Sequence, residues 1–169
     1  MKKIISIIIS IAMCAMLASC GGVKNEVSDT EQPTLIDTMS LEEKVGQILF
    51  VRCVDDEQTD DLMSIKPGGI LMFGRDFEGL TKDEVKEKIQ SYQDKSDIPL
   101  IIGADEEGGT VVRVSSNPNL APEKFKSPQE IYNEGGMDAA VENATEKSEF
   151  LLSLGVNMNL APVADVSTN

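Results

Sequence analysis

Three carboxylates stand side by side in this chain, directly after a short apolar run and directly before two glycines. The apolar run covers residues 98–104 and contains Pro99, and after it come Asp105, Glu106, Glu107, Gly108 and Gly109. A run of this kind favours a central strand of a parallel sheet. Ligands bind where the strands of such sheets end, so the acidic cluster has the position of a binding or catalytic site. A solvated acidic turn is the alternative that the local sequence leaves open.

Helical and strand patterns alternate around this cluster. Capping boxes begin helices at Ser40, Thr81 and Ser127, each followed by glutamate three residues later. Further helices are predicted over 56–66 and from about 137 to 154, the latter ended by Gly155. Strands are predicted over 48–54, 69–73, 99–104 and 156–160. Strands that alternate with helices imply a parallel α/β sheet with right-handed crossovers.

The first residues have the features of a bacterial export signal. Lys2 and Lys3 precede an apolar stretch over 4–17, which is short for a membrane span and typical of a signal peptide. The stretch ends in Leu17-Ala-Ser-Cys20, which resembles a lipobox and implies a leader over 1–19, lipidation of Cys20 and an extracytoplasmic, membrane-anchored lipoprotein. Residues 20–37 are polar and predict a flexible tether. An ordinary secretory leader with an incidental cysteine is the alternative.

The composition narrows the possible partners. The net charge is −14 and the chain has no histidine. An acidic surface repels phosphate backbones, so nucleic acid is a poor partner. Without histidine, and without the spacing of a calcium loop, no metal site and no cofactor are expected. Cys53, in an apolar stretch, is interpreted as a core residue and not as a nucleophile.

Four segments together resemble glycoside hydrolase family 3, in their order and spacing. They are residues 41–49, 67–76, 98–109 and 159–166. Asp-Glu-Glu-Gly-Gly followed by Arg113 is most similar to the bacterial β-N-acetylglucosaminidase branch, because the β-glucosidase branch more usually has Asp-x-x-His-Gly there. The resemblance implies a (β/α)8 barrel of the TIM type, which needs about 250 residues. Residues 38–169 are therefore expected to be only the first half of the catalytic barrel.

The resemblance also implies roles for single residues. Asp105 matches an aspartate that hydrogen-bonds hydroxyls of the bound sugar. Glu107 and Arg113 match positions close to the site, where a buried Arg113–Glu107 pair would hold the loop. Asp165 follows a strand end at the same face and could orient groups that contact sugar, with a structural turn as an equal alternative. Arg75 is interpreted as packing over its loop more readily than contacting ligand.

The groups that break the glycosidic bond are expected outside this sequence. Asp105 and Glu107, about 7 Å apart on an extended segment, would both lie on one side of the sugar, whereas the reaction needs groups on two sides. The family branch implies a histidine acid/base and a late aspartate nucleophile, and this chain has no histidine. The resemblance thus implies a β-N-acetylhexosaminidase acting on terminal β-linked N-acetylglucosamine of cell-wall or glycan fragments, inactive as this segment alone. The alternatives are a β-glucosidase or β-xylosidase, or a lipoprotein that binds sugar without cleaving it.

Overall fold

The described part of the chain alternates helices with four short strands, as the sequence predicts. The computed structural model describes residues 34–52 and 56–164, so Cys20, Cys53 and Asp165 lie outside the described residues. Apart from Thr34, the described residues belong to one compact unit, Leu35–Asn169. In chain order the elements are α2 Leu35–Thr38, α3 Leu41–Gln47, β1 Phe50–Arg52, α4 Asp56–Ser64, β2 Gly69–Met72, α5 Gly74–Phe77, α6 Lys82–Gln93, β3 Ile101–Ala104, α7 Pro128–Leu154 and β4 Met158–Asn159.

The strands form one parallel sheet in the order β1-β2-β3-β4. The register places Val51 beside Ile70 and Ile70 beside Ile102. Strand order therefore equals chain order, and each strand pairs with the strand that precedes it in the sequence. The predicted α/β class is confirmed, and the arrangement is that of part of a TIM-type barrel.

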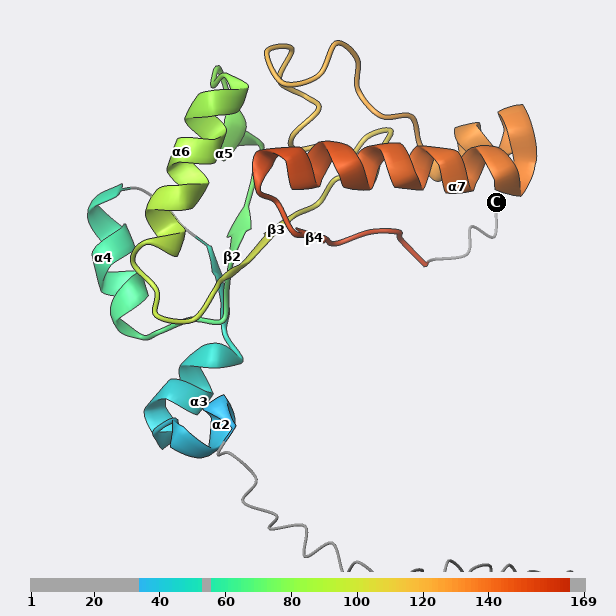
Figure 1. Cartoon of the computed structure of the whole chain (residues 1–169). Coiled ribbons are helices and arrows are strands. Elements are labelled where there is room, and N and C mark those ends of the chain that lie inside the picture. The colour runs from blue at the N-terminus through green and yellow to red at the C-terminus, as the bar shows by residue number, and fades with distance from the viewer. Residues whose placement is uncertain (1–33, 53–55, 165–169) are drawn as a thin grey trace, which may run out of the picture. The chain divides into compact units, whose positions relative to one another are not determined.

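One face of the sheet is buried beneath the helices. Ile70, Met72 and Ile102 are at most 1% exposed and belong to a single apolar cluster. Helices α6 and α7 complete this cluster with Val85, Ile89, Tyr92, Leu151 and Leu154. Figure 1 shows α4 and α6 on the same side of β2. Burial of this apolar face is the main stabilising contribution to the unit.

The opposite face is covered in part by a single aromatic ring. The Phe50 ring lies so close that a Cβ at Gly69 would stand 2.6 Å from it and a Cβ at Gly103 only 2.4 Å. Glycine is needed at both positions because any side chain would occupy the space of that ring. Apolar Ile101 and Met158 remain 41% and 36% exposed. This face corresponds to the interior of a barrel, where side chains normally fill layers.

The predicted helix starts are confirmed. Ser40, Thr81 and Ser127 each accept a hydrogen bond from the backbone N–H of the glutamate three residues on. The two helices predicted on either side of residue 136 are also present: α7 consists of two helices that meet at a kink, where Gly135 and Gly136 have non-helical angles. Gly155 ends it in the left-handed conformation, with φ of 94°.

Several elements differ from the sequence prediction; β3 and β4, for example, are shorter than the strands predicted over 99–104 and 156–160. The first strand begins at Phe50 and not at residue 48, because the N–H groups of Ile48 and Leu49 bond back to the carbonyls of Val45 and Gly46 and so end α3. A short helix, α5, follows β2, and Asp76 caps it by accepting the backbone N–H of Phe73 at 2.7 Å. Residues 35–37, the last of the predicted tether, form part of α2.

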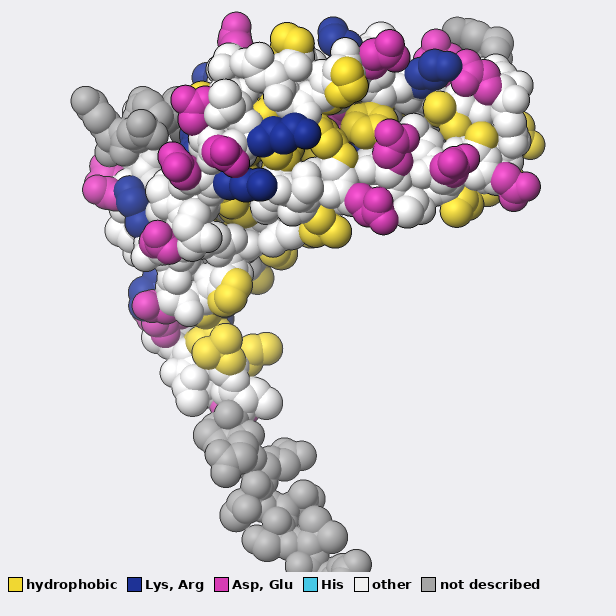
Figure 2. Space-filling model, turned by 45° about the horizontal axis from the view of Figure 1, so that its top comes forward, with side chains coloured by type: hydrophobic (Ala, Val, Ile, Leu, Met, Phe, Trp, Pro, Cys, Tyr) yellow, Lys and Arg dark blue, Asp and Glu magenta, His cyan; other side chains and the backbone are white. Residues whose placement is uncertain are grey.

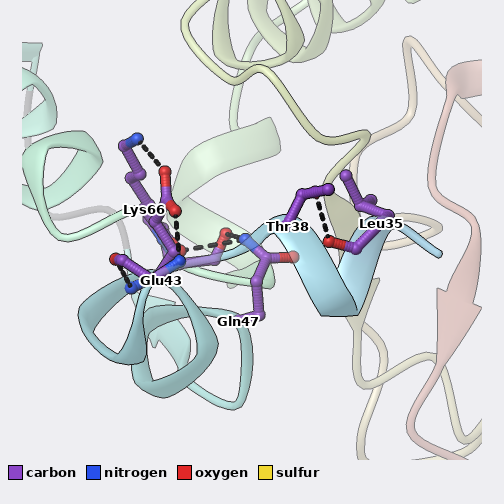
Figure 3. Close-up of polar contacts among 7 residues, drawn as sticks. Leu35, Thr38, Glu43, Gln47 and Lys66 are labelled. Carbon is purple, nitrogen blue, oxygen red and sulfur yellow. Dashed lines mark hydrogen bonds and ion pairs between the residues drawn. The ribbon is translucent and has the colours of Figure 1, made fainter. Parts of the chain in front are cut away.

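Helix α3 is attached to the turn between α4 and β2, at the amino ends of the strands. Figure 3 shows Gln47 pointing to this turn, where its amide donates to the carbonyls of Lys66 and Pro67 at 3.0 and 3.3 Å. Lys66 also forms an ion pair with Glu43. A hollow of about 830 Å³, lined by apolar residues of α3 and by this pair, lies here. It is at the other end of the strands from the acidic cluster.

Candidate functional site

The carboxyl ends of three neighbouring strands bring polar and aromatic side chains together. Arg52 ends β1, Phe73 follows β2, and Asp105 follows β3. The register pairs Met72 with Ala104, so Phe73 and Asp105, the next residues, stand at the same level of the sheet. Alternation places both on the face that carries Phe50, which is the open face of the sheet.

Asp105 forms an ion pair with Arg113. Its Oδ2 lies 3.3 Å from Nη2 and 3.4 Å from Nε of Arg113, so two nitrogens of the guanidinium face one carboxylate oxygen. The side chains of Asp105 and Arg113 are 22% and 32% exposed, which leaves both accessible. Among the described residues, no hydrogen bond or ion pair involves the second oxygen of Asp105, Oδ1.

The predicted Arg113–Glu107 pair is wrong. Arg113 pairs with Asp105, because the loop after β3 returns over the open face and brings Arg113 back to Asp105. Glu107 is half-buried. Its contact with α7 is made by the backbone, since the Glu107 carbonyl accepts a hydrogen bond from Lys147 at 2.8 Å. Its side chain borders a separate open hollow of about 580 Å³ with Ser127 and Val163.

Phe73 stacks with two arginines. The Arg52 Cζ lies 4.3 Å from the centroid of the Phe73 ring, and the Arg113 Cζ lies 5.7 Å from it. Stacking of this kind holds a guanidinium in place while its N–H groups remain available. Neither Arg52 nor Phe73 was singled out as a site residue from the sequence. Arg75, two residues after Phe73, is exposed on α5.

Glu106, which the sequence did not mark as a site residue, accepts hydrogen bonds from four donors. Its side chain is 0% exposed. Oε2 accepts the backbone N–H groups of Arg113 and Val114 at 2.8 and 2.7 Å. The Ser115 N–H lies 3.3 Å from Oε1, and the Ser115 hydroxyl donates to the same oxygen. The signal that could have found it is alternation, since Glu106 must point away from the face of Asp105 and into the helical side.

The loop that carries Arg113 runs over residues 105–127 and is tied down at several points. Asn117 is 5% exposed, and its amide donates to the carbonyls of Phe77 and Leu80 at 2.6 and 2.8 Å. On the other side, Lys147 of α7 is 7% exposed and reaches the carbonyl of Glu107. Burial lowers the pKa of Lys147 below its ordinary value, while the charges of Glu106 and Glu107 act against this shift.

The site contains acidic groups without the arrangement of a metal centre. Among residues 34–52 and 56–164, no group of three or more histidine, cysteine, aspartate or glutamate side chains could hold a metal ion. Acidic side chains are scattered over the visible surface in Figure 2 and not gathered into one patch. No helix within the described ranges is long and apolar enough to cross a membrane.

The fold is that of part of a barrel-type α/β domain, and Arg52, Phe73 and Asp105 lie together at the carboxyl ends of its parallel strands. Residues 40–169 match the glycosyl hydrolase family 3 N terminal domain. The chain therefore belongs to glycosyl hydrolase family 3.

Named relatives and solved structures agree with this family. The chain is 31% identical over 105 residues to β-hexosaminidase A of Pseudoalteromonas piscicida, covering 60% of this chain and 18% of that protein. It is 24% identical over 113 residues to a β-hexosaminidase of Haemophilus influenzae, covering 67% of this chain and 32% of that protein. The segment thus spans well under half the length of these relatives.

Two structures extend the comparison. A family 3 β-N-acetylglucosaminidase from a Paenibacillus species superposes with a TM-score of 0.66 at 26% identity, over 73% of this chain and 24% of that one. A family 3 glycosyl hydrolase from Mycobacterium smegmatis superposes with a TM-score of 0.63 at 22% identity, over 78% of this chain and 38% of that one. The second likeness bears on the fold alone.

Proposed function

We propose that this chain forms the sugar-binding, N-terminal half of the catalytic barrel of a β-N-acetylhexosaminidase that removes terminal β-linked N-acetylglucosamine from cell-wall or glycan fragments. The observation that carries the proposal is the accessible Asp105 carboxylate, held by Arg113 at the carboxyl end of β3. The names of the relatives support the choice of substrate, because they are hexosaminidases and a β-N-acetylglucosaminidase.

Asp105 would bind the sugar through its hydroxyl groups. A carboxylate accepts two hydroxyl hydrogens, and such charge-assisted bonds are short and strong. Arg113 fixes the orientation of the carboxylate before the sugar arrives, so little reorganisation is needed on binding. Glu107 and Asp165 are kept as proposed neighbours of the sugar site, Glu107 through the turn that follows Asp105.

The bond-breaking groups belong, in this proposal, to the part of the complete enzyme that the segment does not span. Glycoside hydrolysis needs one group to protonate the leaving oxygen and another to attack from the opposite side. The chain contains no histidine for the first role. This segment by itself would therefore not hydrolyse glycosides.

The proposal is tested by substrate preference in the complete enzyme. Aryl β-glycosides of N-acetylglucosamine, glucose and xylose are compared at equal concentration. We expect kcat/KM for the N-acetylglucosaminide to exceed the other two by at least tenfold. Preference for glucose or xylose would point to a β-glucosidase or β-xylosidase, and sugar binding without turnover would point to a non-catalytic binding protein. Either result would contradict the proposal.

We also propose that Cys20 carries a lipid that anchors the protein to the outer face of the bacterial membrane. The support is the sequence Leu17-Ala-Ser-Cys20 after an apolar leader. Two or more acyl chains give stable anchoring. Changing Cys20→Ala is expected to abolish incorporation of labelled fatty acid and to move the protein into the soluble fraction. Cys53→Ala, as the control, should leave labelling intact, and a Cys20→Ala variant that stays labelled in the membrane would refute the anchor.

A further inference from the structure

We infer that Glu106 is a positioning residue: its buried carboxylate sets the place of Arg113, and through Arg113 it sets the orientation of Asp105 toward the sugar. This inference rests on the proposed sugar-binding role of Asp105 and adds the residue on which that role depends. Glu106 itself faces away from the open face and does not contact the ligand.

The contacts form a continuous chain from Glu106 to Asp105. Oε2 of Glu106 accepts the backbone N–H of Arg113 at 2.8 Å, so it holds the main chain of the very residue whose guanidinium meets Asp105. The same guanidinium lies 3.3 Å from the Asp105 carboxylate. Glu106 is also the next residue after Asp105, so one short segment supplies both the ligand group and the anchor of its partner.

Glu106 is itself held in place from the neighbouring strand. Asn159 of β4 accepts the backbone N–H of Glu106 at 2.9 Å and donates its amide to the Glu106 carbonyl at 3.0 Å. These two hydrogen bonds continue the pairing of β3 with β4 beyond the end of β3. The main chain of Glu106 is therefore fixed by the sheet. Its side chain, through its hydrogen bonds, fixes the loop relative to the sheet.

A carboxylate suits this task because it has only acceptors. The groups that face it are the N–H groups of residues 113–115 and the Ser115 hydroxyl, all donors. Hydrogen bonds to a charged acceptor are stronger than those between neutral groups. Without that acceptor, three consecutive N–H groups would be left in a buried position, and the loop would move to find other partners.

Two variants of Glu106 separate the effect of its side-chain length from that of its charge. Glu106→Asp keeps the charge but shortens the side chain by one methylene, about 1.5 Å. Glu106→Gln keeps the length: its carbonyl oxygen can still accept from Arg113 and Val114, and only the acceptor for the Ser115 N–H is lost. In the complete enzyme we expect Glu106→Asp to lower kcat/KM for an aryl β-N-acetylglucosaminide by about tenfold or more, and Glu106→Gln to stay within about threefold.

A double-mutant cycle then tests whether the effect passes through Arg113. In an Arg113→Met background, Glu106→Asp should cost less than twofold, because the guanidinium to be positioned is already absent. All variants are assayed well below the lowest unfolding temperature of the set. A purely structural role predicts the same loss in both backgrounds, and that result would overturn the inference.

A second measurement requires no turnover. The NMR resonance of Arg113 Nε–H reports its pairing with Asp105 in arginine-labelled protein, and it is assigned by its loss in Arg113→Met. It should move in Glu106→Asp and stay near the wild-type position in Glu106→Gln. An unmoved resonance in Glu106→Asp overturns the inference even if the enzyme is active. Absence of glycosidase activity in the wild type, with the resonance shifted as expected, would instead count against the proposed function alone.

Discussion

Replacing Asp105 with alanine is expected to lower kcat/KM for a β-N-acetylglucosaminide by about 10²-fold or more in the complete enzyme. A charged hydrogen-bond partner of the substrate contributes about 1.5–3 kcal/mol, and the loss of orientation adds to this. The effect should be large because Asp105 is pre-oriented by Arg113 at 3.3 Å and stays accessible on the open face. The measurement is steady-state kinetics with an aryl glycoside.

The fold should tolerate this change, which separates function from stability. Asp105 is half-buried and its side chain faces outward from the sheet, so the unfolding temperature should change little. Glu78→Ala, at an exposed position after α5, is the matched control and should leave both kinetics and stability unaltered. Activity of Asp105→Ala within twofold of wild type would mean that Asp105 is only a turn residue.

Replacing Asn117 with alanine is expected to destabilise the protein by on the order of 2–4 kcal/mol. The Asn117 amide is the donor to the Phe77 and Leu80 carbonyls and thereby ties the loop over residues 105–127 to the connection between α5 and α6. Its removal withdraws both donors from a position that is 5% exposed, where water cannot replace them. Chemical unfolding of the complete enzyme measures the change.

Asn119 provides the control, since it lies two residues away in the same loop. Its amide donates to the Gly79 carbonyl at 3.0 Å, but the contact is exposed. Asn119→Ala should cost less than about 1 kcal/mol because water can take over the lost bond. Equal losses for the two variants would show that burial does not decide the contribution of the Asn117 contacts.

The fold was largely predictable because its signals are local. Capping boxes mark the first turns of three helices, and Gly155 marks the end of α7. These signals are local because backbone groups at helix ends must find partners within a few residues. The alternation of elements then leaves a parallel sheet as the economical arrangement. The start of β1 was misplaced, since Ile48 and Leu49 are as apolar as a strand and only their bonds to α3 distinguish them.

The site was predictable in position and less so in its contacts. The strand end marked Asp105, and the resemblance marked Arg113, but the partner of Arg113 depends on how the loop returns over the sheet. That path is set by Glu106 and Asn117 through contacts between residues 7 to 40 positions apart in sequence. Arg52 and Phe73 meet only because β1 and β2 are neighbours, which no local pattern encodes.

The order of the strands in the sheet is also the order in which they leave the ribosome. β1 pairs with β2, β2 with β3, and β3 with β4, so each strand is added beside the one made just before it. Phe50, whose ring lies over Gly69 and Gly103 in the folded unit, precedes both glycines in the chain. No strand has to insert between two that are already paired, although long connections separate β2 from β3 and β3 from β4. A pause in synthesis after any strand therefore leaves a correctly ordered edge on which the next strand can add.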